Sequence, residues 1–361
     1  MTRTKFDTKN FTGATILIVG GAGFVGSNLA KMLLKEDIKK LIVVDNLLSA
    51  DMVNVWDDPR VEFIPRSITN AEVLERLPDD LDYAYQLATF HGNQSSIEDP
   101  MRDHMHNNYS SLALFNRLAQ IKGLKKIVYA AAACAVAAKT YGEATATDEE
   151  APVSLFHDSP YSVSKIIGEL YGNYYWKSDG LPFVKARFMN VYGPGEILGA
   201  GRWRGTVHTI WRNVTPTFVF KSLHGEALPL DDEGRTSRDF IFVEDMARGL
   251  MAAALHGKPS EAYNLASGDE TTIRELAEAI NKATGNGTPL DLRKARRAWD
   301  SSGNRFGSAA KAEAELGFKA SVGIEEGIAK TVAWTKENMP TIKRCIAQHV
   351  HFVPDAKKYL G

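Results

Sequence analysis

Short apolar runs alternate with longer amphipathic segments through the first half of the chain. Runs of β-branched and aliphatic residues predict strands at 14–20, 41–46, 61–66, 84–88, 125–131 and 182–188. Between them, helical spacing of apolar residues predicts helices at 27–36, 104–121 and 161–176. Strands that are apolar at nearly every position are typical of a parallel sheet covered by helices on both faces. We therefore expect an α/β fold with a doubly wound parallel sheet.

The pattern changes after the segment NVYGPGE at 190–196. Glycine and tryptophan become frequent, the apolar runs shorten, and helical spacing returns at 242–256, 273–285 and 323–338. We expect two domains, the first over 1–195 and a smaller α+β domain over 196–361 that binds the substrate. The helix near 242–257 is free to return to the first sheet, since the second domain need not be contiguous.

Composition narrows the class of protein further. Hydrophobic residues make up 44% of the chain and charged residues 24%, which suits a globular protein with a full core. The formal net charge of -1 gives no electrostatic reason to expect nucleic acid or an acidic membrane surface. The polar first fifteen residues lack the apolar segment of a signal peptide, and the longest apolar run has only twelve residues. We expect a cytoplasmic protein without a membrane or nucleic-acid partner.

The two cysteines give no sign of a metal site. Cys134 and Cys345 lie far apart in unlike surroundings, so neither a metal-binding spacing nor a disulfide framework is present. We therefore expect no structural or catalytic metal ion.

A glycine-rich turn follows the first predicted strand and opens the first predicted helix. In GGAGFVG, Gly20 permits a tight turn, Gly23 lets backbone amides approach a pyrophosphate, and Gly26 allows close packing of helix against strand. The next strand ends in VVDN, which places Asp45 nineteen residues after Gly26. A carboxylate there accepts hydrogen bonds from ribose hydroxyls and repels a 2′-phosphate. The pattern predicts a Rossmann-type site that prefers NAD to NADP.

The segment SPYSVSK carries a tyrosine and a lysine four residues apart, Tyr161 and Lys165. Such residues share one face of a helix, and an ammonium group near a phenol favours the phenolate. A phenol of lowered pKa can act as a general base toward a sugar hydroxyl. The spacing alone also occurs as an ordinary surface pair.

Taken together, these motifs resemble the extended branch of the short-chain dehydrogenase/reductase superfamily, the nucleotide-sugar epimerases and dehydratases. The segments LIVGGAGFVGSNL, VVDN, YQLA, SPYSVSK, ARFMNVYGPG, RDFIFVEDMARGL, YNLASG and LGF stand in the order and spacing of that branch. The similarity is greatest to polysaccharide and O-antigen pathway epimerases that act on UDP-sugars. It implies that Tyr161 is the base and that Lys165 also holds the nicotinamide ribose.

The resemblance also implies the remaining contacts to the cofactor. Besides the glycines and Asp45, these are Phe24, Val25, Asn46, Ser67, Ile68, Leu87, Ala88, Thr89 and Asn107. One departure lies on the adenine side, where the branch commonly ends its third strand in Gly-Asp-Ile. Here the matching residues are Arg66, Ser67 and Ile68, and a serine bonds an amine more weakly than an aspartate does.

A second departure concerns the strand before Tyr161, in the stretch IVYAAAACAVAA. The branch usually places a serine or threonine there, whose hydroxyl bonds the substrate oxygen, and the matching residue here is Ala132. Loss of one such donor typically costs a few kcal/mol of transition-state stabilisation. Three explanations are open: another group such as Cys134, Thr140, Thr89 or Ser95 takes over, the site uses tyrosine alone, or the protein binds a sugar nucleotide without turnover.

The residues at the end of the same strand argue against two related activities. The placement of Cys134 is similar to that of the GDP-mannose 3,5-epimerases, but the downstream segment GRWRG carries arginines where their lysine stands, and arginine does not deprotonate. The 4,6-dehydratases end this strand in Asp-Glu, which is absent here. A small buried hydrophobic residue is the simpler interpretation of Cys134.

The resemblance and the arginine-rich segment at 199–216 indicate which residues bind the substrate. Guanidinium groups bind diphosphates and carboxylates through paired donors, so Arg202, Arg204 and Arg212 are candidates for either, or for surface stacking on tryptophan. The segment 217–230 resembles the strand and loop that hold the nucleotide base in this branch. The implied substrate contacts are Asn190, Arg202, Arg204, Thr217, Arg238 and His91, although a lone histidine is more often structural.

These expectations combine into one hypothesis, an NAD-dependent nucleotide-sugar 4-epimerase that forms a transient 4-keto sugar. A UDP-hexose or UDP-hexuronate is the expected substrate, and a homodimer pairing through helices near 102–121 and 161–177 is expected from the resemblance. The alternatives are a UDP-uronate decarboxylase or other dehydratase that forms a 4-keto sugar, and a catalytically silent protein that binds NAD or a sugar nucleotide.

Overall fold

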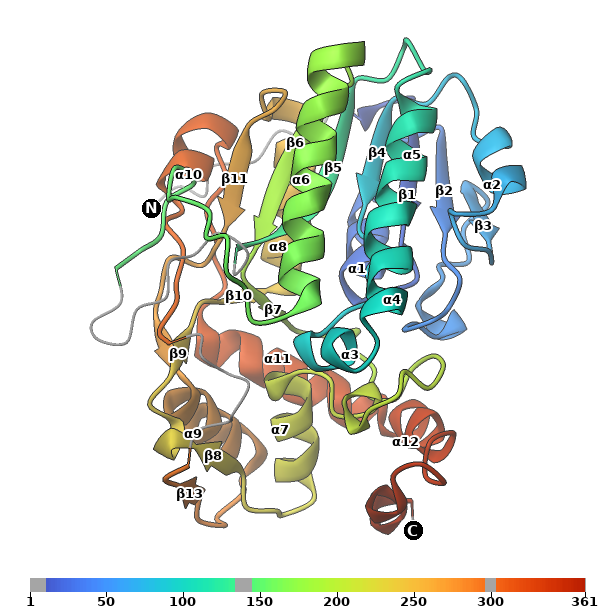
Figure 1. Ribbon diagram of the computed structural model, residues 1–361. Helices are drawn as coiled ribbons and strands as arrows, with labels where there is room; N and C mark the ends of the chain where they lie inside the picture. Colours follow the sequence, from blue (N-terminus) through green and yellow to red (C-terminus); the bar gives the residue numbers. More distant parts are fainter. Residues whose placement is uncertain (1–10, 134–144, 296–302, 361) are drawn as a thin grey trace.

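A parallel sheet forms the larger part of the computed structural model, which describes residues 11–133, 145–295 and 303–360 (Figure 1). Its strands are β1 (Thr15–Val19), β2 (Lys40–Val44), β3 (Val61–Ile64), β4 (Tyr83–Gln86), β5 (Lys126–Ala132), β6 (Phe183–Phe188) and β11 (Ala262–Leu265). They lie in the order β11-β6-β5-β4-β1-β2-β3, and every neighbouring pair is parallel. The order reverses between β1 and β4, so the predicted doubly wound α/β fold is confirmed.

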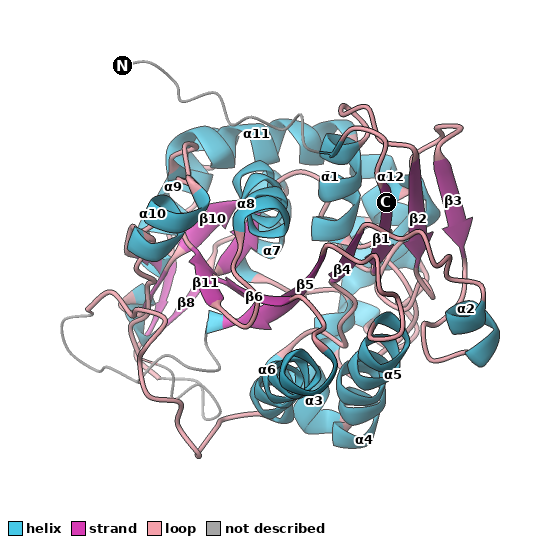
Figure 2. Ribbon diagram, turned by 90° about the horizontal axis from the view of Figure 1, so that it is seen from above, coloured by secondary structure: helices cyan, strands magenta, loops and turns pink. Residues whose placement is uncertain are grey.

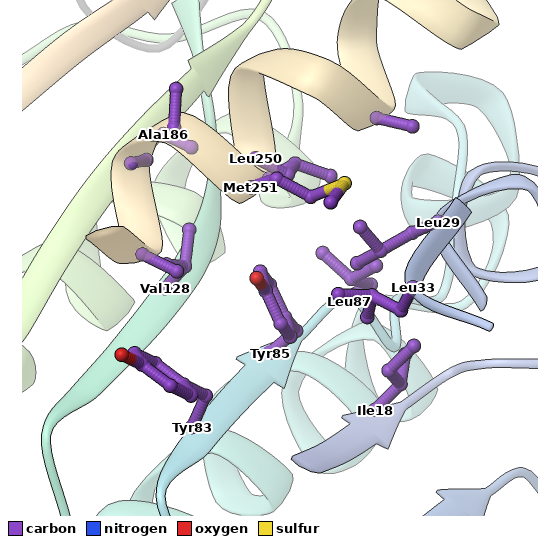
Figure 3. Packing of buried hydrophobic residues seen from close by; sticks show 14 of the residues in the cluster. Ile18, Leu29, Leu33, Tyr83, Tyr85, Leu87, Val128, Ala186, Leu250 and Met251 are labelled. Carbon is purple, nitrogen blue, oxygen red and sulfur yellow. The ribbon is translucent and has the colours of Figure 1, made fainter. Parts of the chain in front are cut away.

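Helices cover both faces of this sheet (Figure 2). One face carries α1 (Phe24–Leu33), α8 (Val243–His256) and α10 (Ala310–Leu316), and the other carries α2 (Ala71–Glu75), α5 (Ser110–Leu118) and α6 (Pro160–Asp179). Side chains alternate along each strand, so Ile18 packs toward α1 and α8 whereas Leu17 packs toward α5. Figure 3 shows Ile18 and Tyr85 beneath Leu250 and Met251 of α8. Burial on two faces explains why the strands are apolar throughout.

The chain after residue 196 contributes to both parts of the molecule. The helices α7 (Val214–Leu223), α9 (Ile273–Thr284), α11 (Ile324–Glu337) and α12 (Met339–Ala347) form the smaller part (Figure 1). Its short strand pairs are β7 (Asn190–Tyr192) with β10 (Phe240–Phe242), β8 (Pro229–Asp231) with β13 (Asp291–Arg293), and β9 (Ser237–Arg238) with β12 (Thr271–Thr272). By contrast, α8, α10 and β11 belong to the layers of the large sheet. The division into domains 1–195 and 196–361 stays a prediction.

Two predicted elements differ from the structure. The helix expected over 104–121 begins earlier, as α4 (Pro100–Asp103), and passes through a π-helix, η3 (His104–Tyr109), before α5. The segment 217–230, expected to begin as a strand, is helical up to Leu223 and belongs to α7. Residues 215–220 are all buried, because α7 lies between two apolar clusters. A short run that is apolar on every side does not distinguish helix from strand.

None of the helices in the described ranges combines the length and apolar character that a membrane crossing requires. In the same ranges, no group of three or more histidine, cysteine, aspartate or glutamate side chains is arranged to hold a metal ion.

Candidate active site

A large cleft opens where the carboxyl ends of the parallel strands meet the smaller part of the molecule. Its volume is about 1630 Å³, and residues from both parts line it, among them Val19 at the end of β1 and Phe218 of α7. Open α/β sheets bind their ligands at this edge, beside the point where the strand order reverses. The cleft is therefore the place to look for the predicted site residues.

The glycine turn lies against the end of β4 and leaves no room for side chains. Gly20 has a φ of +86°, and a Cβ there would lie 2.6 Å from the amide nitrogen of Ala88. A Cβ on Gly26 would lie 2.3 Å from the carbonyl oxygen of Gly20. Helix α1 begins after Gly23 with neither a side-chain cap nor an acidic residue in its first turn. Its first amide groups and its dipole thus suit a phosphate group.

Asp45 connects the glycine turn to the loop that follows β2. Its carboxylate accepts hydrogen bonds from the amide of Ala22, at 3.1 Å, and from the amide of Leu47, at 2.8 Å. Burial raises the pKa of Asp45, and these backbone bonds lower it in turn. A carboxylate fixed in this way at the edge of the cleft is suited to accept from ribose hydroxyls.

Most residues expected to contact the cofactor line the same cleft. These are Gly20, Gly23, Phe24, Val25, Gly26, Asp45, Asn46, Ser67, Ile68, Leu87, Ala88 and Thr89. Asn107 is the exception, because it lies buried behind the wall of the cleft. Its side-chain oxygen accepts from the hydroxyl of Thr89 at 3.1 Å and from the amide of Phe90 at 2.8 Å. Asn107 thus supports the loop after β4.

Tyr161 and Lys165 lie in the first turns of α6 and both line the cleft. The helix is fixed at its start by Ser159, whose hydroxyl accepts from the amide of Ser162. Lys165 is only 3% exposed, and its Nζ donates to the carbonyl oxygen of Ala130 at 2.9 Å. The same ammonium lies 5.6 Å from the centre of the Tyr161 ring. The structure thus brings a buried cation beside the phenol.

The alanine that departs from the family pattern is also at the site. Ala132 ends β5 and lines the cleft, whereas Cys134 and Thr140 lie outside the described residues. Of the two other hydroxyls considered, Thr89 lines the cleft but donates to Asn107, and Ser95 is buried away from the cleft. Neither residue replaces the missing hydroxyl in the arrangement described.

His91 and Arg204 form one wall beside Tyr161. The rings of His91 and Tyr161 meet edge to face with their centres 5.8 Å apart. Enclosure by the protein lowers the pKa of His91 to about 3, and the Arg204 guanidinium acts in the same direction. The guanidinium of Arg204 is 1% exposed and donates to the carbonyl oxygens of His91 and His208. Burial lowers the pKa of Arg204 to about 9. A neutral imidazole therefore adjoins the Tyr161 ring, and a buried cation holds the backbone of His91.

The other predicted substrate residues divide into two groups. Asn190, Thr217 and Arg238 line the cleft. Arg202 does not; it donates to the carbonyl oxygen of Asn46 at 3.2 Å and so contacts the loop after β2. Arg202 therefore contacts the loop after β2 and does not line the cleft.

Glu196 was not predicted from the sequence as a site residue, although it lines the cleft. It is buried, and the side-chain amide of Asn213 donates to one of its oxygens. Burial raises the pKa of Glu196 to about 7. The sequence offered one indication, because Glu196 directly follows the segment NVYGPG. No known spacing of motifs assigns a function to an acidic residue at that position.

Comparison with known proteins shows the family of the chain. The model of the NAD dependent epimerase/dehydratase family matches residues 16–266. The chain belongs to this family. The Bordetella bronchiseptica enzyme WbmF in complex with NAD+ is 52% identical with a TM-score of 0.84, over 94% of this chain and 98% of that one. Its complex with NAD+ and UDP gives a TM-score of 0.86 at 52% identity, over 96% and 99% of the two chains.

Relatives in the family include more than one reaction class. A UDP-glucose 4-epimerase from Lacticaseibacillus casei is 30% identical, over 90% of this chain and 98% of its own length. A dTDP-glucose 4,6-dehydratase from Streptomyces antibioticus is 29% identical, over 90% of this chain and 92% of its own length. The expected resemblance to nucleotide-sugar epimerases and dehydratases is confirmed, and so is NAD as the cofactor. The protein is an enzyme of this family.

Proposed function

We propose that this enzyme is a nucleotide-sugar 4-epimerase that acts on a UDP-hexose or UDP-hexuronate. The observation that carries the proposal is the position of Tyr161, which lies beside the Lys165 ammonium in the same cleft as the glycine turn. The complex of WbmF with UDP and the epimerases among the relatives support a UDP-sugar. The Asp-Glu pair that the resemblance associates with dehydration is missing from the end of β5.

The residues fit the cofactor that the family uses. Side chains at Gly20 and Gly26 would strike the backbone of Ala88 and of Gly20, so only glycine permits the tight turn beside the start of α1, and Asp45 offers a carboxylate for the ribose. Lys165 would bond a ribose hydroxyl as well as act on Tyr161. NAD held there would supply the acceptor, and later the donor, of the hydride at C4 of the sugar.

The residues of the chain then perform the proton chemistry. The phenolate of Tyr161 takes the proton of the C4 hydroxyl, while Lys165 stabilises the negative charge on the phenol oxygen. The resulting 4-keto sugar turns within the cleft and presents its other face. Tyr161 returns the proton to the C4 oxygen, which gives the epimer. The size of the cleft, about 1630 Å³, is consistent with a sugar nucleotide held beside the cofactor.

The first experiment incubates the NAD-loaded enzyme with a panel of UDP-hexoses and UDP-hexuronates and identifies the products. Interconversion of C4 epimers is expected. Release of carbon dioxide from a hexuronate would instead show a decarboxylase, and absence of turnover across the panel would favour a binding protein.

Replacement of Tyr161 by phenylalanine tests the mechanism. Loss of a positioned general base typically costs 10²- to 10⁴-fold in rate, so we expect kcat of Tyr161→Phe to fall by at least about a hundredfold while NAD stays bound. Tyr174→Phe is the matched control, because Tyr174 lies on the same helix but does not line the cleft. Full turnover by Tyr161→Phe would exclude the proposed role of this phenol.

A further inference from the structure

The imidazole ring of His91 lines the cleft and makes no hydrogen bond within the part of the chain that the structure describes. The backbone of this residue is fixed, because its carbonyl oxygen accepts from the guanidinium of Arg204 at 3.1 Å. A histidine with a purely structural role normally has its ring nitrogens bonded within the protein. The ring nitrogens of His91 are therefore available to a ligand in the cleft.

The segment that carries His91 is joined to the helix that carries Tyr161. The helix α3 (Asn93–Glu98) begins two residues after His91 and packs against α6. The backbone amide of Tyr161 donates to the hydroxyl of Ser96 in α3 at 3.2 Å. The rings of His91 and Tyr161 meet edge to face with their centres 5.8 Å apart. A sugar oxygen that bonds to the phenol can therefore also lie beside the imidazole.

The imidazole is neutral at physiological pH. Enclosure by the protein lowers the pKa of His91 to about 3, and the positive charges of Arg204, Arg212 and Lys165 act in the same direction. A neutral imidazole has one N–H donor and one acceptor nitrogen. Such an N–H can polarise a carbonyl oxygen by a hydrogen bond while it keeps its own proton.

The site needs a donor of this kind at the end of β5. Ala132 stands there in place of the hydroxyl that is typical of the family, and neither Thr89 nor Ser95 supplies one. Strands β4 and β5 are parallel neighbours. The loop after β4, which carries His91, therefore lies at the same edge of the sheet as Ala132.

We infer that His91 is a catalytic residue whose imidazole N–H donates a hydrogen bond to the C4 oxygen of the sugar, in place of the hydroxyl that Ala132 lacks. The inference rests on the proposed function and adds a residue to its mechanism. In the oxidation, Tyr161 takes the proton of the C4 hydroxyl and the hydride leaves C4 for the cofactor, while the N–H stabilises the negative charge on the oxygen. In the reduction, the N–H polarises the C4 carbonyl and Tyr161 returns the proton. His91 keeps its own proton throughout.

Replacement of His91 by phenylalanine keeps a planar ring and removes the donor. Loss of one donor to a developing oxyanion typically costs 10²- to 10³-fold in kcat, so we expect kcat of His91→Phe to fall by about a hundredfold while NAD stays bound. His91→Gln retains an N–H donor and is expected to recover part of the lost rate. His351→Phe, the same substitution at an exposed histidine outside the cleft, is the control and should leave kcat unchanged.

A double substitution tests whether His91 and position 132 act on the same oxygen. In the His91→Phe protein, Ala132→Ser would restore the missing donor, whereas in the wild-type protein it would add a second one. We therefore expect the gain in kcat from Ala132→Ser to be larger in the His91→Phe protein than in the wild type. Equal gains in the two proteins would show that the positions act independently and would overturn the inference.

Binding without turnover separates this inference from the proposed function. UDP-glucose and UDP-4-deoxyglucose differ in the C4 hydroxyl, and the NAD-loaded Tyr161→Phe protein removes the contribution of the phenol. One hydrogen bond is worth about fivefold in affinity, so calorimetry is expected to show about fivefold tighter binding of UDP-glucose, and the His91→Phe/Tyr161→Phe protein should lose this preference.

A preference for UDP-glucose that is equal with and without the imidazole, or an unchanged kcat in His91→Phe, would contradict the assignment of His91. If His91→Phe does not retain NAD, His91→Leu removes the same donor with an aliphatic side chain and is expected to show the same losses. A preference that depends on His91, in a protein without 4-epimerase activity, would leave the hydrogen bond in place and remove the proposed function.

Discussion

Ala132 is the residue whose chemistry differs most from the pattern of this enzyme family. It ends β5 at the cleft, and neither Thr89 nor Ser95 supplies a hydroxyl in its place. We therefore expect Ala132→Ser to raise kcat by about tenfold, less than the hundredfold or more that a fully positioned donor to a developing oxyanion contributes. Steady-state kinetics on the sugar that the panel identifies would measure the change.

Ala84→Ser is the control for this prediction. Ala84 of β4 packs into the apolar cluster beneath α5 and does not line the cleft. A serine there is expected to lower stability without a gain in kcat. If Ala132→Ser also gives no gain, another group already performs the role of the hydroxyl.

At the scale of single residues, the sequence predicted the site residues that belong to motifs of fixed spacing. Gly20, Gly26 and Asp45 could be placed in one cleft because a glycine turn after a strand requires them at set distances. Glu196 could not be located, since its importance depends on burial by segments distant in the chain. Arg202 was expected among the substrate contacts, yet it reaches the loop after β2, because composition reveals the chemistry of an arginine but not its direction.

At the scale of elements, the loop after β2 is held by two segments that are distant from it in the chain. Arg212 donates to the carbonyl oxygen of Ser49 at 2.9 Å, and Arg344 of α12 pairs with Asp51 at 3.0 Å. Asp45, which fits the cofactor ribose, stands at the start of this loop. The Arg344–Asp51 pair is partly exposed, so its contribution is about 1 kcal/mol or less.

We expect Arg344→Ala to loosen this loop and to speed the dissociation of NAD by up to about fivefold, the factor that corresponds to about 1 kcal/mol. Stopped-flow displacement of bound NADH measures the rate. Arg344→Lys keeps the charge and is expected to restore most of the retention, and Lys357→Ala, an exposed change in the same C-terminal segment, serves as control. An unchanged rate in Arg344→Ala would show that α12 does not hold the loop.

Helices and strands were predictable where the period of apolar residues and the length of the segment indicated the same element, as in β1 and α9. They were less predictable where tertiary contacts determine the secondary structure. Helix α7 was expected as a strand because it is buried on all sides between two apolar clusters, which removes the period that would have marked it. The π-helix η3 carries no local sequence signal. Buried hydrogen bonds, such as the one that Asn107 donates to Asp103, hold this segment in place, and they are seen only in the folded structure.

At the scale of the whole molecule, one helical face carries apolar side chains that remain exposed. On α6, Leu170 is 62% exposed and Tyr174 61%, and Met101 of α4 is 70% exposed; Met105 and Tyr109 continue the row along η3. These helices lie on the same side of the sheet (Figure 2). Exposed apolar side chains gathered on neighbouring helices are typical of an interaction site, and the matching helices of a second copy would cover them in a symmetric way. We propose a homodimer through this face.

Leu170→Glu tests the dimer, because a two-fold axis brings the substituted side chain into the interface from both copies. Burial of one leucine contributes roughly 1.5–3 kcal/mol, so two lost leucines and two introduced charges are expected to weaken association by at least about a hundredfold. Sedimentation velocity over a range of concentrations measures the shift from dimer to monomer. Leu292→Glu, an equally drastic change at an exposed leucine of β13, is the control and should leave the dimer intact. A Leu170→Glu protein that remains dimeric would place the interface elsewhere, and a wild-type monomer would remove the homodimer altogether.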